Sequence, residues 1–238
     1  DADADTSITA DTDDQVDIKV GGTDRLRMAG NNIFLNGGTD ARIQLGSGGS
    51  GANTVGNDTV HIRGEGDNMK FMAAANGTYL FENNGTSHMS ISADGEVTKP
   101  LQPAFSARNN ATQSNIDNNT LILFGAETFD IGSNFASDHT FTAPVTGKYQ
   151  LNAMVRMDNL DSSGTWVAMT IQTSNRNYTM LNSASTLDTD SGYWTFTVTA
   201  LADLDANDTA NVLFNKSGGS DTGDAQDSAA HFNGFLAC

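Results

Sequence analysis

The feature that most constrains the fold is a strict alternation of apolar and polar residues in the second half of the chain. Every second residue is apolar along 149–157, and 193–201 alternates Thr with Trp, Phe, Val and Ala. Alternation with period two places one face of a β-strand against a core and leaves the other face in solvent. Gly, Asn, Asp and Thr occur too densely for a helical period. The sequence therefore predicts an all-β protein with almost no α-helix.

Further short strands are expected between turn residues in the same half of the chain. The segment 121–124, Leu-Ile-Leu-Phe, has the pattern of a fully buried strand. Eight or more strands joined by short turns are typical of a β-sandwich. The remaining strands are predicted at 141–143, 166–172, 178–181, 209–214 and 231–237.

A short motif recurs in the first half of the chain. Copies begin at Gly22, Gly38 and Gly85, and a weaker one begins at Asn57. Each copy places a Gly-Thr or Asp-Thr turn before a short strand with alternating polarity. Such strands are too short and too polar to be stable alone, so neighbouring strands must bury one face. The Gly- and Ser-rich segment 46–51 interrupts the pattern and is expected to be a flexible loop.

Composition divides the chain into four parts. Two of its three prolines fall in 99–103 and predict a short, semi-rigid joint. The segment before the repeats consists mainly of Asp, Ala, Thr and Ser, which indicates an extended or disordered lead-in. The parts are the lead-in at 1–14, a β-repeat stem at 15–98, the joint at 99–103 and a sandwich head at 104–238.

The chain is strongly acidic, with 29 Asp and Glu against 12 Lys and Arg and a net charge of −17. This charge argues against nucleic acid as a partner, because phosphates are bound by Lys and Arg. No apolar run approaches the ~18 residues of a membrane helix, so no membrane insertion is expected. Because Cys238 is the one cysteine of the chain, an intramolecular disulfide is excluded. We expect Cys238 to be a free thiol without a functional role.

Catalytic patterns are missing from the sequence. None of the four histidines, at 61, 88, 139 and 231, forms His-x-x-x-His or pairs with Cys238. The chain contains no Gly-x-Ser-x-Gly, no P-loop and no dinucleotide-binding fingerprint. We therefore expect that the protein is not an enzyme.

Two motifs of the second half resemble the globular heads of C1q-like and tumour-necrosis-factor-like proteins. Phe-Thr-Ala-Pro-Val-Thr-Gly-Lys-Tyr at 141–149 is similar to that family's Phe-x-Ala-Pro-x-x-Gly-x-Tyr core, and Phe-Asn-Gly-Phe-Leu at 232–236 is similar to its last strand. The segment 204–210 is similar to the family's Leu-x-x-Gly-Asp-x-Val stretch, but it has Asn207 at the position of the Gly. The resemblance implies a β-jelly-roll that associates as a homotrimer and binds ligands without catalysis.

The repeats at 15–98 resemble the β-rich stems of phage tail fibres and related virion spikes, in which three chains supply the missing neighbours. Together the two resemblances predict a homotrimeric fibre at the virion surface. Its head would contact a host-surface glycan or protein, and its N-terminus other virion proteins. Two alternatives stay open: a secreted, extracellular C1q-like binding protein unrelated to viruses, and a purely structural capsid or tail decoration protein.

The resemblance places both ends of the head at its base, next to the stem. Because antiparallel strands alternate in direction, loops 158–164, 182–192 and 215–230 should then lie at the far end, where a receptor would bind. The candidate receptor-binding residues in and beside these loops are Asp158, Asp161, Asp188, Asp190, Tyr193, Lys216, Asp221, Asp224 and Asp227.

Most of these residues are acidic, and close carboxylates repel one another unless a cation or a basic ligand intervenes. Ca²⁺ binds six to eight oxygen atoms, often from flexible loops. Asp188, Asp190, Asp221 and Asp224 are therefore candidate calcium ligands. The alternative is a set of acidic loops that are simply solvated.

Overall fold

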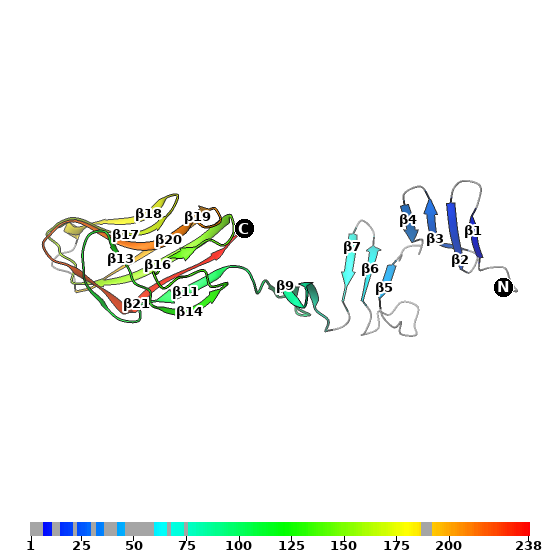
Figure 1. Ribbon diagram of the computed structural model, residues 1–238, viewed down its shortest axis with the longest axis horizontal. Helices are drawn as coiled ribbons and strands as arrows, with labels where there is room; N and C mark the ends of the chain where they lie inside the picture. Colours follow the sequence, from blue (N-terminus) through cyan, green and yellow to red (C-terminus); the bar gives the residue numbers. More distant parts are fainter. Residues whose placement is uncertain are drawn as a thin grey trace. The chain divides into compact units, whose positions relative to one another are not determined.

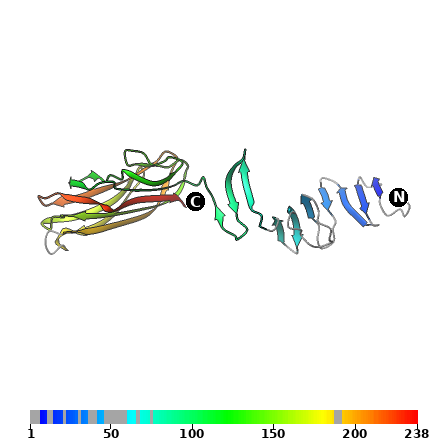
Figure 2. The same ribbon diagram turned by 90° about the horizontal axis from the view of Figure 1, so that it is seen from below.

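The structure is a computed structural model (Figures 1 and 2), which describes residues 7–10, 15–20, 23–29, 32–35, 42–45, 60–65, 68–73, 76–186 and 192–238. The chain forms two compact units, Asp1–Lys99 and Pro100–Cys238. The described residues form β-strands and one short 3₁₀ turn, η2 (Ala184–Thr186), and contain no α-helix. The expectation of an all-β protein is confirmed.

The described residues of the first unit form three small antiparallel sheets. Each sheet is a meander, in which strands that follow one another in sequence pair side by side. The first sheet contains β1 (Ser7–Ala10), β2 (Gln15–Val20), β3 (Thr23–Ala29) and β4 (Asn32–Leu35); the second contains β5 (Arg42–Leu45), β6 (Val60–Glu65) and β7 (Asn68–Met72); the third contains β8 (Tyr79–Asn83), β9 (Thr86–Ile91) and β10 (Val97–Thr98).

Strand β1 lies inside the segment 1–14 that was expected to be an extended or disordered lead-in. Its residues Ile8 and Ala10 pair with Ile18 and Val16 of β2. The β-propensity of a segment depends on its neighbours, and here β2 pairs with β1 along its whole length. The expected loop at 46–51 lies outside the described residues.

The third sheet leaves large apolar side chains exposed on both of its faces. Leu80 and Phe81 follow one another in β8, so they point to opposite faces. They are 54% and 55% exposed. Met69 and Phe71 of β7 are likewise exposed. In the described part of the unit, these apolar side chains of β7 and β8 therefore remain exposed to solvent.

The second unit is a sandwich of two antiparallel sheets, and the order of the strands in these sheets is that of a jelly roll. The first sheet has the order β14 (Ala126–Ile131), β11 (Ala104–Arg108), β21 (Gly223–Leu236), β16 (Gly147–Asp158) and β19 (Trp194–Leu204), and β12 (Gln113–Ile116) also pairs with β21. The second sheet has the order β13 (Thr120–Leu121), β20 (Thr209–Gly218), β17 (Gly164–Thr173) and β18 (Asn177–Ser183), and β15 (Phe141–Thr142) also pairs with β20.

Aromatic side chains fill the space between the two sheets. The ring of Phe105 stacks on Phe141 at a centroid distance of 4.6 Å and meets the edge of Phe232 at 5.0 Å. The alternating residues of β16 are buried from Tyr149 to Met157, as the sequence pattern predicts. The segment 121–124 differs from its prediction: Ile122 and Phe124 are buried, but Leu123 is 39% exposed.

Strands β20 and β21 are longer than the sequence predicts, and the expected loop 215–230 shrinks to 219–222. Gly218 and Gly219 both have positive φ, a conformation that glycine adopts without strain, so the chain turns sharply there. Strand β21 accommodates its extra length in a bulge at 226–229, between the pairs Met157–Ala225 and Val155–Ala230. Lys216, Asp224 and Asp227 consequently lie on strands.

Backbone hydrogen bonds define a base and a tip of this sandwich. The N–H of Leu236 donates to the carbonyl of Pro103 at 3.0 Å, and the N–H of Asn207 donates to the carbonyl of Ala143 at 2.8 Å. Both ends of the unit and the loop after β19 lie at one end, the base, because Tyr149 of β16 pairs with Leu236 and Gly147 pairs with Leu204. Since β16 runs from the base at Gly147 to Asp158, the loops after β16 and before β21 lie at the tip.

Candidate ligand-binding site at the tip of the sandwich

Three side-by-side positions cross the sheet β14-β11-β21-β16-β19 of the sandwich at its tip. Asp158 of β16 pairs with Asp224 of β21, and Tyr193 directly precedes Trp194, which pairs with Met157. Met157 and Ala225 are fully buried, so the alternating residues Asp158 and Asp224 point to the solvent face of the sheet. The fold thus brings three sequence-predicted residues, Tyr193, Asp158 and Asp224, into one row.

Arg156 organises one end of this row. Its Nε donates to Asp158 Oδ1 at 2.9 Å and its Nη2 donates to Asp158 Oδ2 at 3.0 Å. The guanidinium also lies 5.1 Å from the centroid of the Tyr193 ring. A bidentate ion pair together with a cation–π contact holds both partners in place. Tyr193 nevertheless remains 69% exposed, so its ring presents a surface to solvent.

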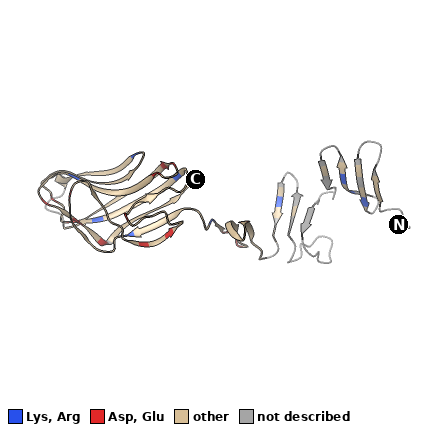
Figure 3. Cartoon of the chain, viewed as in Figure 1, with Lys and Arg blue, Asp and Glu red and all other residues tan. Residues whose placement is uncertain are grey.

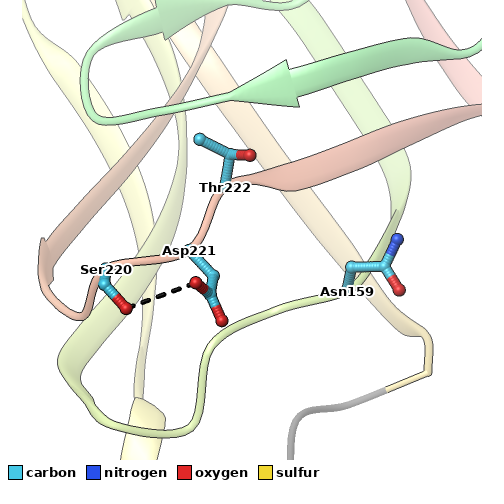
Figure 4. A pocket seen from close by; sticks show the side chains of 4 residues that line it. All are labelled: Asn159, Ser220, Asp221 and Thr222. Atoms are coloured by element: carbon cyan, nitrogen blue, oxygen red, sulfur yellow. Dashed lines mark hydrogen bonds between the residues drawn. The ribbon is translucent and has the colours of Figure 1, made fainter.

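A polar pocket of about 470 Å³ adjoins the other end of the row. It is lined by Asn159, Ser220, Asp221 and Thr222, and Figure 4 shows these side chains with the hydrogen bond between Ser220 and Asp221. Asn159 has a positive φ of 59°, which Asn tolerates better than most residues. Its Nδ2 donates to Asp224 Oδ2 at 2.8 Å, which connects the pocket to the row.

Asp161 has a structural role at the tip. Its carboxylate accepts hydrogen bonds from the backbone N–H groups of Ser163 at 2.8 Å, Ser220 at 2.7 Å and Asp221 at 3.1 Å. A hydrogen bond from the Ser163 side chain, followed by these backbone bonds, holds the pKa of Asp161 well below its usual value. Asp161 therefore fastens the loop after β16 to the loop before β21.

Lys216 also has partners within the sandwich. Its Nζ donates to the carbonyl of Asp221 at 2.6 Å and lies 3.1 Å from Asp117 Oδ1. Its side chain is 11% exposed. The positive charge of Lys216 is therefore mostly neutralised and covered. The Lys and Arg positions of the sandwich, blue in Figure 3, are spread over several strands.

The sequence-predicted residue Asp227 lies away from this pocket. Asp227 belongs to the bulge of β21 and lines a different pocket of about 410 Å³, beside Arg108 and His231 on the face of the sheet. Asp188 and Asp190 lie outside the described residues. Among the residues that the structure describes, no group of three or more His, Cys, Asp or Glu is placed to hold a metal ion. Calcium binding stays a prediction.

Sequence reasoning did not single out Arg156, Asn159, Ser220 or Thr222. A signal for Arg156 was present in the alternation of β16, which puts it on the same face as Asp158. For Asn159, Ser220 and Thr222 the sequence holds no comparable signal, because their approach depends on the turn at Gly218 and Gly219 and on Asp161.

Comparisons with known proteins give structural neighbours only. No family model and no curated protein matches the sequence. The globular domain of zebrafish complement 1qA protein is 19% identical, with 58% of this chain and 98% of that chain covered and a TM-score of 0.43. Murine APRIL is 12% identical (57% and 98% covered, TM-score 0.42), and Eiger TNF from S. frugiperda is 11% identical (58% and 92%, TM-score 0.43). The described part of the chain has no helix long and apolar enough to cross a membrane.

Proposed function

We propose that this protein is a homotrimeric, non-enzymatic fibre or spike protein of a virion. In this proposal Asp1–Lys99 is a stem that assembles with two other copies, and Pro100–Cys238 is a C1q-like head that binds a host-surface receptor. Other virion proteins would contact the N-terminus. The virion assignment rests on the likeness of the repeats at 15–98 to the stems of phage tail fibres.

The observation that carries the proposal is the exposed apolar surface of the stem sheets. Leu80 and Phe81 expose large side chains on opposite faces of the third sheet, and two faces cannot both fold onto one neighbour. Burying apolar surface stabilises an assembly by about 25 cal/mol per Å². Identical copies arranged about an axis are the simplest source of that cover, because each copy brings the same exposed strands.

The head adds a second apolar surface that an assembly would cover. Phe235 of β21 and Leu201 of β19 both pair with Gln150 of β16. The three residues therefore form a row on the solvent face of this sheet of the sandwich, in its basal half. Phe235 is 47% exposed and Leu201 is 59% exposed. Contact between basal halves of neighbouring heads would leave the tips available to a receptor.

Two measurements on the purified chain test the proposal. Light scattering should give a mass near three times 25.1 kDa. A fluorescently labelled chain should bind to some members of a panel of bacterial cells, and an excess of unlabelled chain should displace it. A monomer mass at all concentrations would overturn the trimeric stem, and absence of binding on every cell type would overturn the receptor role.

A further inference from the structure

In the sandwich, the solvent face of the sheet that contains β21, β16 and β19 changes in polarity from base to tip. The basal row holds Phe235 and Leu201 on either side of Gln150. In the middle, side chains bond to one another: Thr199 Oγ1 donates to Asn152 Oδ1 at 2.6 Å, and Asn152 Nδ2 donates to Asn233 Oδ1 at 3.3 Å. The tip row, Tyr193, Asp158 and Asp224, combines an exposed ring with carboxylates. The tip is therefore the part of this face suited to a polar ligand.

The tip offers two different kinds of contact next to each other. Tyr193 presents an aromatic ring, which has an apolar body able to stack on an apolar ring face. The adjoining pocket presents an amide, two hydroxyls and a carboxylate, from Asn159, Ser220, Thr222 and Asp221. Amides and carboxylates bond the hydroxyl groups of a ligand as donors and acceptors. A sugar combines both requirements, because its ring has an apolar face and hydroxyl groups at its rim.

We propose that the tip binds a neutral oligosaccharide, with one sugar ring stacked on Tyr193 and the hydroxyl groups of the next ring bonded in the pocket. Adjacent strands lie about 4.8 Å apart, so the positions of Tyr193 and Asp224, on either side of Asp158, are about 10 Å apart. That distance is close to the span of two linked sugar rings. The inference rests on the proposed receptor-binding function and names the class of receptor.

The charges at the tip select against acidic sugars. Among the residues that the structure describes, Arg156 beside the site is paired with Asp158, and Lys216 is paired with Asp117. Asp221 and Asp224 remain as anions beside the pocket, in a chain whose net charge is −17. A carboxylate or sulfate on the ligand would therefore meet like charges without a free basic partner. The structure thus favours neutral sugars over sialylated or sulfated ones.

The test uses the full chain on an array of neutral, sialylated and sulfated oligosaccharides, followed by calorimetry with the strongest neutral one. Tyr193→Ala should weaken that binding about three- to tenfold, the range that ring-stacking contacts give. Thr222→Val removes one pocket hydroxyl with little change in shape and should also weaken it. Leu181→Ala, at a 59% exposed position on β18 of the other sheet, is the control and should leave the affinity unchanged.

Two results would overturn the inference: binding only to sialylated or sulfated sugars, or a neutral sugar whose affinity is the same for Tyr193→Ala and the unchanged chain. Cell binding separates this failure from failure of the proposed function. If the chain binds no sugar but still binds cells whose glycans were oxidised by periodate, the receptor is a protein and only the sugar inference fails. If it binds neither sugars nor cells, both fail.

Discussion

The carboxylate of Asp161, on the loop after β16, accepts a hydrogen bond of 2.7 Å from the backbone N–H of Ser220, on the loop before β21. The same oxygen accepts from the N–H of Asp221 at 3.1 Å. Two loops far apart in sequence are thereby joined at the tip, and the pocket wall formed by Ser220, Asp221 and Thr222 depends on this contact.

Asp161→Asn should loosen the tip. The amide oxygen can still accept from the N–H groups at one of the two carboxylate positions, but the NH₂ group at the other position cannot accept, so at least one backbone N–H loses its partner. We expect the melting temperature to fall by about 3–6 °C. Differential scanning calorimetry would measure it, with Asp203→Asn as control, because Asp203 is 71% exposed at the base in an ion pair with Lys148. Equal melting temperatures for the two variants would contradict the structural role of Asp161.

Acidification should have the same effect as that substitution. The pKa of Asp161 lies below its ordinary value of 3.8 in the folded state, since hydrogen bonds stabilise the carboxylate. A depressed folded pKa contributes stability that is present above pH ~4 and is lost as the pH falls through the folded pKa. Urea unfolding between pH 6 and pH 2 should therefore show the difference between the unchanged chain and Asp161→Asn shrink below pH ~4. A constant difference across this range would count against the prediction.

The exposed apolar residues of β8 give a prediction for assembly. Replacing Phe81 by Ser should weaken association by about 1.5–3 kcal/mol per buried side chain, because the side chain would no longer be transferred from water into an interface. Light scattering over a dilution series should then show dissociation at a higher protein concentration than for the unchanged chain. Glu82→Ser, the next residue of the same strand and also exposed, is the control. If both variants dissociate at the same concentration as the unchanged chain, Phe81 lies outside any interface.

The fold was predictable where one face of a strand is buried and the other is not. In β16 the alternation from Tyr149 to Met157 encodes the position of the strand directly, because each apolar residue has a core neighbour. The range 215–230 was predicted incorrectly as one loop. Its strands are held by pairing with β16 and β17, and its turn by two glycines, so its polar composition misled the prediction.

The candidate site was less predictable, because its geometry depends on contacts between segments far apart in sequence. The sequence indicated Asp158, Tyr193 and Asp224, which the structure places in one row. The sequence could not show that the carboxylate of Asp161 is occupied by backbone N–H groups, nor that Asn159 reaches Asp224. An acidic loop residue that binds a ligand and one that caps a loop have the same sequence signal.

The glycine in the Phe-x-Gly-Phe-Leu motif at 232–236 has a packing role that can be tested. A Cβ atom on Gly234 would lie 2.6 Å from Leu151 Cδ2, 2.9 Å from Phe105 Cε1 and 3.0 Å from the carbonyl oxygen of Gln150. The two side chains belong to the core and the oxygen belongs to the neighbouring strand, so none of them can move freely.

Gly234→Ala should therefore destabilise the protein by about 1–3 kcal/mol, the usual cost of adding a methyl group to a packed core. Gly192→Ala is the matched control, because a Cβ atom there would meet nothing within 4 Å. Chemical unfolding of both variants measures the difference, with the urea midpoint expected to fall for Gly234→Ala alone. Equal midpoints would mean that β21 shifts away from β16 at low cost, and the motif's glycine would then need another explanation.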